Sequence, residues 1–156
     1  MIRFVAFTEV DYRAWALQAV PEFALNNVEE GRWTLAESLE KSRQAHAELL
    51  PQGLDTPGQF LVHLQDADSG AQVGALWWAE SDSPGGREAF VYNIVISESA
   101  RRRGFARAAF QELERLARAH GVRHLGLHVF GHNPGARRLY EQLGFQPTSI
   151  TMRKIL

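Results

Sequence analysis

The spacing of hydrophobic residues changes along the chain from that of strands to that of a helix and back to that of a strand. This order restricts the fold more than any other sequence feature. Three apolar runs with strand character, at residues 60–64, 73–80 and 89–97, are separated only by short turns, so they are expected to pair antiparallel. Apolar residues three and four apart then predict an amphipathic helix over residues 101–120. The alternating segment 125–130 follows, and a strand reached through a helical crossover pairs parallel to the strand before it. The sequence therefore predicts an α/β layered domain around one mixed sheet.

The flanking parts of the chain add helices and extended segments. Two Thr-x-x-Asp/Glu patterns are typical of helix starts, and a proline followed nine residues later by Leu-Gly is typical of a short helix. The predicted elements are an opening strand over residues 2–7, a helix from Thr8 toward Asn26, a helix from Thr34 to Pro51, a short helix over residues 134–143 and an extended segment over residues 145–156.

Length and composition narrow the class of protein. The chain has 156 residues, which predicts a single domain over residues 1–156 because domains usually have about 100 to 200 residues. The absence of cysteine excludes disulfide scaffolds, thiolate nucleophiles and zinc fingers. The longest apolar run, residues 89–96, is eight residues long, whereas a helix that spans a membrane needs about 20 apolar residues. No signal-peptide core follows the N-terminus, so we expect a cytoplasmic protein without membrane association.

Charge is distributed unevenly, although the net charge is only −1. Residues 1–100 carry 6 basic and 15 acidic side chains, a balance of −9, whereas residues 101–156 carry 11 basic and 3 acidic ones, a balance of +8. A summed field attracts ligands of the opposite charge. The second part of the chain is therefore expected to meet an anion and the first part a cation.

Basic residues are concentrated where the strand at residues 89–97 turns into the long helix. A helix N-terminus carries about half a positive charge, so arginines there are unfavourable unless an anion binds to them and to the free N–H groups of the first turn. Gly104 has no side chain that would keep a bulky anion from the backbone. This arginine cluster consists of Arg101, Arg102, Arg103, Gly104, Phe105, Ala106 and Arg107.

The arginine cluster predicts a phosphate cradle, and a solvated helix start is the alternative. The sequence contains neither a P-loop motif nor a G-x-G-x-x-G fingerprint, which argues against nucleoside triphosphate and Rossmann sites. Aromatic residues are not interleaved with the arginines as binding of single-stranded nucleic acid requires. We therefore expect no nucleic-acid partner.

Two motifs give the chain a resemblance to a known family. Arg101-x-x-Gly104-x-Ala106 after an apolar strand resembles the acyl-CoA pyrophosphate loop of the GNAT superfamily of N-acetyltransferases. A second set of residues has the order and spacing of that family, namely Leu127, Val129, Asn133, Ala136, Leu139, Tyr140, Gly144 and Phe145. The resemblance covers residues 88–156 most strongly. The earlier part is similar to a bacterial subgroup whose substrate the resemblance does not supply.

The resemblance implies the family's fold and an acetyl-CoA co-substrate. The implied fold is a GNAT-like mixed, mostly antiparallel twisted sheet, splayed between strands 4 and 5 and flanked by helices. A slot for the pantetheine arm would open between the strands that end at residues 97 and 130. Backbone groups of Ile94, Val95 and Ile96 would pair with pantetheine amides, and a bulge in the first of these strands would aim an N–H at the thioester oxygen. The arginine cluster would bind the pyrophosphate.

The resemblance also implies roles for two residues of the short helix. Tyr140 stands where a phenol serves as general acid in many family members and protonates the departing CoA thiolate. A tyrosine that only packs against its neighbours is the alternative. Asn133 has two open interpretations, a contact with the cofactor and a cap of the helix.

The base that deprotonates the attacking amine is less well defined. In the family it is often a carboxylate on the central strand, but the matching position here is Phe90. Glu88 and Tyr92 project to the same face as Phe90, because strand side chains alternate, so either could serve. Glu88 could equally be a solvated surface acid. His128 lies beside the implied slot, and we interpret it as a packed, hydrogen-bonded histidine.

The remaining expectations concern the acceptor. Glu29, Glu30 and Trp33 lie between the first two helices, where this fold builds the acceptor lip, and a merely solvated loop is the alternative. Histidines spaced four apart in the second half do not lie on predicted helices, so we expect no metal. The resemblance thus implies an N-acetyltransferase that acts on an amine of a small molecule or peptide. The alternative is a catalytically inactive acyl-CoA-binding or regulatory protein of the same fold. The oligomeric state is left open by the sequence, and a homodimer is compatible with it.

Overall fold

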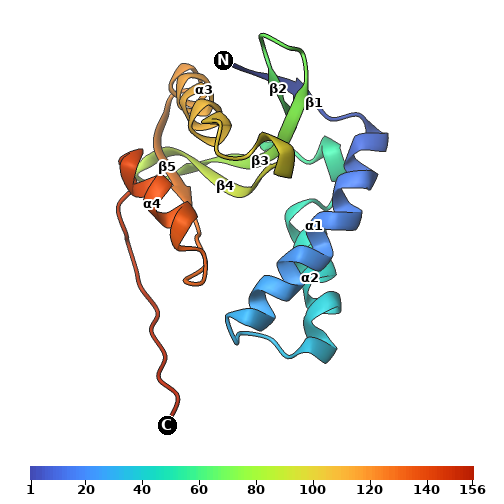
Figure 1. Cartoon of the computed structure of the whole chain (residues 1–156), viewed down its shortest axis with the longest axis vertical. Coiled ribbons are helices and arrows are strands. Elements are labelled where there is room, and N and C mark those ends of the chain that lie inside the picture. Colours follow the sequence, from blue (N-terminus) through green and yellow to red (C-terminus); the bar gives the residue numbers. More distant parts are fainter.

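The computed structural model describes residues 1–156 and contains one five-stranded sheet with four α-helices (Figure 1). Both long helices near the N-terminus begin at the predicted caps. The Thr8 N–H donates to Asp11 Oδ2 at 2.7 Å, and the Thr34 N–H donates to Glu37 Oε1 at 3.3 Å. The elements are β1 (Ile2–Ala6), α1 (Glu9–Glu29), α2 (Leu35–Leu49), the 3-10 turn η1 (Gly53–Asp55), β2 (Gln59–Asp66), β3 (Gln72–Ser83), β4 (Gly86–Ile96), the 3-10 turn η2 (Glu98–Ala100), α3 (Phe105–Ala119), β5 (Val122–Leu127) and α4 (Pro134–Gln142).

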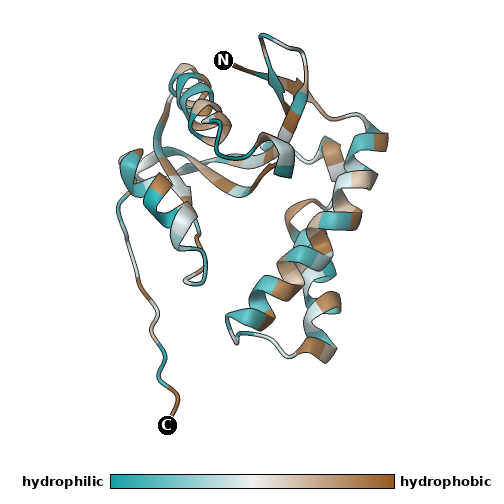
Figure 2. Cartoon of the chain, in the orientation of Figure 1, coloured by the Kyte–Doolittle hydropathy of each residue, from teal (hydrophilic) through white to brown (hydrophobic).

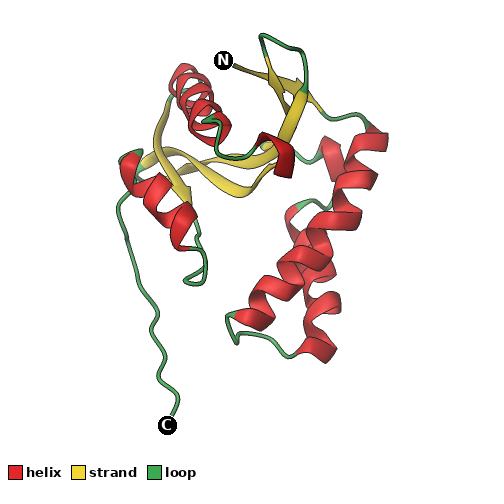
Figure 3. Cartoon of the chain, viewed as in Figure 1, coloured by secondary structure: helices red, strands yellow, loops and turns green.

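The strands, yellow in Figure 3, form one sheet, and their order is β1-β2-β3-β4-β5. The first four strands pair antiparallel with their neighbours, whereas β4 and β5 pair parallel. The predicted mixed, mostly antiparallel sheet is therefore confirmed, including the parallel crossover through α3. β1 and β5 form the two edges of the sheet.

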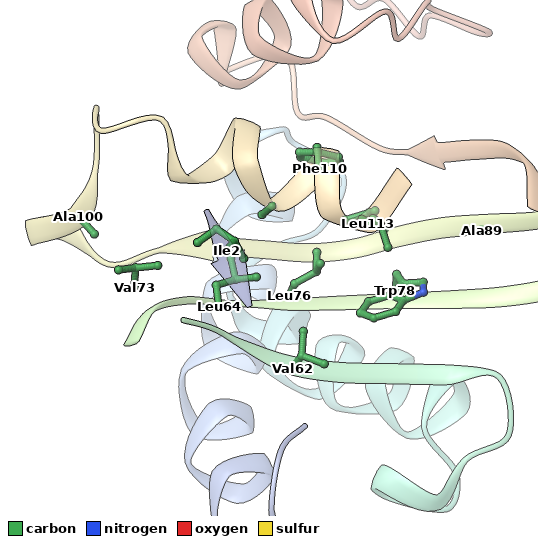
Figure 4. Close-up of a cluster of buried hydrophobic side chains, with 12 residues drawn as sticks. Ile2, Val62, Leu64, Val73, Leu76, Trp78, Ala89, Ala100, Phe110 and Leu113 are labelled. Carbon is green, nitrogen blue, oxygen red and sulfur yellow. The ribbon is translucent and has the colours of Figure 1, made fainter. Parts of the chain in front are cut away.

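Different helices cover the two faces of the sheet (Figure 1). On one face, Phe110 and Leu113 of α3 pack with Leu76 and Trp78 in a cluster of 12 buried residues (Figure 4). α1 and α2 lie against the other face, where Trp77 belongs to a smaller buried cluster. The adjacent tryptophans separate because side chains alternate along a strand. The partners of Trp77 in the smaller cluster are Phe7, Leu50 and Leu61.

The predicted start of α3 was wrong. The helix begins at Phe105 rather than at Arg101. Arg102 and Gly104 have φ angles of 59° and 82°, and residues with positive φ cannot continue a right-handed helix. The residues before Phe105 therefore form an irregular loop that joins β4 to α3.

The predicted limits of β5 were also wrong. The strand covers Val122–Leu127 rather than residues 125–130. It begins directly after Gly121, whose φ of 77° terminates the preceding helix. It ends at Leu127 because its pairing with β4 stops there.

Residues 145–156 contain no helix or strand, in agreement with the predicted extended segment. The segment leaves the body of the molecule beyond α4 (Figure 1). Among the helices, none combines the length and the apolar character that a membrane span requires.

Candidate functional site

β4 and β5 separate halfway along β4. Their parallel register ends with the pair Val91 and Leu127, but β4 continues to Ile96 while still pairing with β3. Residues 92–96 of β4 therefore have no strand on the β5 side. Backbone polar groups require partners, so this edge can form hydrogen bonds with an extended ligand. The predicted splay between strands 4 and 5 is confirmed, although both strands end earlier than predicted.

A β-bulge marks the point of separation. In the pairing of β3 with β4, Trp78 lies opposite Val91 and Trp77 lies opposite Asn93, so Tyr92 is the extra residue. The Tyr92 ring stacks on the Trp77 ring with centroids 4.7 Å apart. A bulge disrupts the regular ladder and re-aims the bulged residue. Tyr92 is therefore the residue at which the strand changes from a paired sheet member to an open edge.

The open edge of β4 leads through η2 into the arginine cluster. The backbone N–H groups of residues 102–107 donate to no acceptor in the protein, and the first turn of α3 contains no acidic residue. A Cβ atom placed on Gly104 would have no neighbour within 4 Å, so the space over the loop is open. Consecutive free N–H groups at a helix N-terminus form an anion-binding site. The loop thus offers the free donors and the open space that such a cradle needs, and binding of a phosphate by the arginine cluster stays a prediction.

The side chains of the arginine cluster form no ion pairs, whereas arginines farther along α3 pair with glutamates within one turn. Arg101 Nε donates to the Ile96 carbonyl oxygen at 3.2 Å. The Arg103 guanidinium lies 5.0 Å from the centroid of the Phe105 ring. The Ile96 carbonyl, one of the backbone groups predicted to pair with pantetheine, is therefore shared with Arg101. The positive charge of the cluster is not compensated by acidic side chains.

Two predicted residues lie on α4 or at its start. The Tyr140 ring packs against Phe110 and Phe145, with centroids 5.4 and 5.9 Å away. Burial raises the pKa of the Tyr140 phenol, so its hydroxyl is protonated at neutral pH. Asn133 Oδ1 accepts the Ala136 N–H at 3.2 Å. This side chain therefore caps α4, and a contact of Asn133 with a cofactor stays a prediction.

The candidate bases on β4 differ in their distance from the opening. Glu88, Phe90 and Tyr92 share one sheet face, as strand alternation predicted. Glu88 lies four residues before the bulge, which corresponds to about 13 Å along a strand. Its Oε1 is 4.0 Å from Nδ1 of the exposed His124. This position favours the surface interpretation of Glu88.

His128 lies at the opening itself, directly after the last residue of β5. Its ring meets the Phe130 ring edge-on at 4.9 Å, as expected for a packed histidine, but it forms no hydrogen bond within the chain, so only the hydrogen-bonded part of the prediction was wrong. The pairing between β4 and β5 ends at Leu127, one residue before His128. Burial lowers the pKa of His128 and the charge of Arg32 lowers it further, while Glu30 opposes them. The imidazole is therefore neutral at pH 7 and can accept a proton.

The predicted acceptor lip is tied to the loop after β5. Glu30 Oε2 lies 2.9 Å from His132 Nδ1, and Glu30 Oε1 accepts the Gly131 N–H at 3.3 Å. The hydrogen bonds from His132 and Gly131 lower the pKa of Glu30. His132 Nε2 also lies 3.0 Å from Asn26 Oδ1 and 3.4 Å from Glu29 Oε2. Sequence reasoning did not select His132, because its partners lie about 100 residues away in the chain.

Two more features lie near α1 and α2, one on the sheet and one in the loop between these helices. The Asn93 Oδ1 atom is buried and has no hydrogen-bond partner, and Asn93 lies opposite Trp77 in the register. An asparagine inside an apolar run was the visible signal for such a residue. Trp33 packs against Phe23, which in turn contacts Phe130, with centroid distances of 5.5 and 6.5 Å. The lip is therefore aromatic as well as acidic.

Comparison with known proteins identifies the family to which the chain is similar. Residues 24–145 match the Acetyltransferase (GNAT) family. The chain is 37% identical over 149 residues to the uncharacterized N-acetyltransferase YdgE of Bacillus subtilis, with 96% of this chain and 94% of that protein covered. It is 39% identical over 147 residues to YycN of the same organism, with 94% and 93% covered. The crystal structure of YycN matches with a TM-score of 0.93 at 36% identity, covering 100% of this chain and 99% of that one.

A mixed sheet that splays between β4 and β5, with free backbone N–H groups at the start of α3, is the class of fold found in GNAT-type acetyltransferases. The chain belongs to the GNAT family of acetyltransferases. Membership in this family implies an acyl-CoA co-substrate and an amine acceptor.

Proposed function

We propose that the protein transfers an acetyl group from acetyl-CoA directly to an amine of a small molecule or peptide. The observation that carries this proposal is the continuous path from the open edge of β4 to the free N–H groups of residues 102–107. The first part suits a chain of amides and the second suits a diphosphate. CoA contains both groups, connected in one molecule.

The residues along this path fit the co-substrate. The backbone of Ile94, Val95 and Ile96 lies on the part of β4 that has no β5 partner, where it can pair with the pantetheine amides. The arginine cluster and its free N–H groups would hold the diphosphate, and Gly104 leaves room for it. Acetyl-CoA itself supplies an acetyl thioester with a thiol leaving group.

Three groups of the protein would act at the reacting atoms. The backbone N–H of Tyr92, at the bulge, would donate to the thioester oxygen and stabilise the negative charge that develops there. Tyr140, which burial keeps protonated, would donate a proton to the departing thiolate sulfur. An acceptor that arrives as an ammonium ion must lose one proton before it attacks, and the nitrogen loses a second proton as the new C–N bond forms and the C–S bond breaks. A base must take one of these protons, and the other replaces the proton that Tyr140 gives to the thiolate.

We assign the role of base to His128 rather than to Glu88. His128 lies where the strands separate, whereas Glu88 lies near the start of β4 beside His124. The lowered pKa of His128 keeps the imidazole neutral at pH 7, as a general base requires. The Tyr92 side chain, stacked on Trp77, would serve as a wall of the acceptor site.

This assignment predicts a defined pH profile. The reactive form has neutral His128, so kcat/KM should rise with pH through an apparent pKa below the ordinary 6.5 and then level off. His128→Gln should lower kcat/KM by about 100-fold and remove this acidic limb. His124→Gln, which changes an exposed histidine of β5 four residues earlier in the chain, is the matched control. An acidic limb that persists in His128→Gln would exclude this residue as the base.

The acceptor should carry a positive charge before it reacts. Residues 1–100 have a balance of −9, and Glu29 and Glu30 stand at the rim formed by α1 and the loop after β5. Such a rim attracts an ammonium group and raises its local concentration. The nearby rings of Trp33 and Phe130 provide apolar surface beside this charge.

The proposed function is tested with the purified chain, acetyl-CoA and a panel of primary amines that includes polyamines, amino acid derivatives and peptide N-termini. We expect CoA to bind with a micromolar Kd in calorimetry and thiol release to exceed the background with at least one class of amine. CoA binding without thiol release across the panel would support the catalytically inactive alternative. Absence of CoA binding would contradict both functions.

A further inference from the structure

Two aromatic side chains of the central strand β4 are exposed beside the opening between β4 and β5. Phe90 and Tyr92 are 37% and 39% exposed, and their ring centroids are 4.9 Å apart. Phe90 pairs with Gly126 of β5, and a Cβ placed on this glycine would lie 3.3 Å from the Phe90 ring. The Phe90 ring therefore lies over the paired part of β5, next to the point where the strands separate. Adjacent exposed rings on a central strand form a candidate binding surface.

These two rings begin a continuous series of ring contacts. The Tyr92 ring stacks on Trp77, which belongs to the sheet face against which α1 and α2 lie. From Trp77 the contacts continue through α2 and α1 to the loop after β5. The members of this aromatic series, in order, are Phe90, Tyr92, Trp77, His46, Phe23, Phe130 and His128, with successive ring centroids 4.7 to 6.5 Å apart. The aromatic series therefore starts on one side of the opening and ends on the other.

The aromatic series presents little polar surface to a ligand. Figure 2 shows hydrophobic stretches along β4 and a hydrophilic loop at the start of α3. His46 Nδ1 lies 2.8 Å from the Ser42 carbonyl oxygen, and burial lowers the pKa of His46, so its imidazole is neutral at pH 7. Asn93 Oδ1 is buried. An acceptor rich in hydroxyl groups, such as a sugar, would lose its hydrogen bonds with water on this surface without replacing them.

The acids at the rim already have partners within the chain. Glu30 Oε2 lies 2.9 Å from His132 Nδ1, and Glu29 Oε2 lies 3.4 Å from His132 Nε2. These carboxylates hold the loop after β5, so they are not free to bind the second ammonium group of a polyamine. Their charge and the balance of −9 over residues 1–100 disfavour an acceptor that carries a carboxylate. The acceptor that fits both the rim and the aromatic series is a monoamine with an apolar body.

We propose that the acceptor is an arylalkylamine, a primary amine joined to an aromatic ring by a short alkyl chain, and that Phe90 selects it. This inference rests on the proposed function, since it names the substrate class of the same site. The amine nitrogen would lie between His128 and the bulge at Tyr92, while the aryl ring would pack on the exposed rings of Phe90 and Tyr92. Phe90 precedes the bulge by two residues, about 7 Å along a strand, which a short alkyl chain can span.

Matched amines give the first test. Thiol release from acetyl-CoA is measured with phenethylamine, hexylamine, diaminohexane and phenylalanine, which vary the ring, a second ammonium group and a carboxylate one at a time. We expect kcat/KM for phenethylamine to exceed that for hexylamine by about 10-fold, and the values for diaminohexane and phenylalanine to be lower still. Transfer to hexylamine or diaminohexane that equals or exceeds transfer to phenethylamine would overturn this inference and leave the proposed function standing. Absence of thiol release with every amine would contradict both.

Substitution of Phe90 gives the second test. Phe90→Leu keeps an apolar side chain but removes the ring, so the ratio of kcat/KM for phenethylamine to that for hexylamine should fall by about 5- to 10-fold, mainly through KM of the aryl amine. Phe90→Tyr keeps the ring and should keep the ratio. Phe4→Leu is the matched control, because the Phe4 ring packs 5.7 Å from that of Trp78 on the opposite sheet face. The ratio does not depend on the amount of folded enzyme, and an unchanged ratio in Phe90→Leu would refute the role of Phe90.

Discussion

Gly104→Val is expected to weaken CoA binding by about 10- to 100-fold. Gly104 has a φ of 82°, a conformation that costs a residue with a Cβ about 1 to 2 kcal/mol and a β-branched residue more. The loop of the variant should therefore relax, so that the N–H groups of residues 102–107 no longer converge on one anion. Binding would have to restore the strained conformation and also accommodate the valine methyl groups in the space over the loop, which is open in the native chain. Calorimetry with CoA measures the change in Kd directly.

Gly121→Val is the matched control for this experiment. Gly121 has a φ of 77° at the opposite end of α3, and a Cβ there would also have no neighbour within 4 Å. The two variants should therefore lose similar thermal stability, since the backbone strain is similar. Only the change at Gly104 should alter the Kd for CoA. Equal Kd values for both variants would show that the diphosphate binds elsewhere, and the proposed function would lose its main support.

The sequence predicted those parts of the fold that depend on local pattern. Alternation over residues 59–65, the apolar runs at residues 73–80 and 89–97, and three-four spacing over residues 101–120 indicate strands and a helix because they reflect which sides of each element are buried. The same patterns do not define where the backbone leaves the helix. Arg102 is the clearest case, since its φ of 59° excludes it from α3, although arginine is a good helix former.

The break between β4 and β5 could be expected only from the family resemblance. Strand pairing is a long-range property, and residues 92–96 are as apolar as many paired strand segments. The bulge at Tyr92 depends on the register with Trp77 and Trp78, which no local sequence signal specifies. The arginine cluster was easier to identify, because its charge is unfavourable at a helix N-terminus without an anion.

Contacts between distant segments account for most of what sequence reasoning missed. Glu80 is buried on β3, where it accepts a hydrogen bond from Trp78 Nε1 at 3.2 Å and lies 2.9 Å from Nδ1 of His120, forty residues away. His132 meets Glu30 across 102 residues. In both cases the histidine appeared in the sequence as an isolated residue beside a glycine or an asparagine. Its partner became evident only when the sheet brought the segments together.

Tyr140→Phe is expected to lower kcat by about 100-fold, the lower end of the effect of a positioned general acid. The substitution removes only the hydroxyl, so the ring contacts with Phe110 and Phe145 should persist and the fold should be unchanged. Burial raises the pKa of Tyr140. The wild-type phenol therefore stays protonated from acid pH to beyond neutral pH, and the loss should be similar across that range. The Kd for CoA should not change, since the hydroxyl acts on the leaving sulfur and not on the diphosphate.

Tyr12→Phe serves as the control, because Tyr12 also has a raised pKa caused first by burial and then by Glu9 but lies on α1 outside the proposed chemistry. Steady-state kinetics with the best amine of the panel gives kcat for each variant. Thermal denaturation verifies that both variants are folded. If Tyr140→Phe kept the wild-type kcat, the thiolate would have to leave without a proton from this residue, and the role of α4 would be reduced to packing. If kcat and CoA affinity fell together, the phenol would contribute to binding rather than to proton transfer.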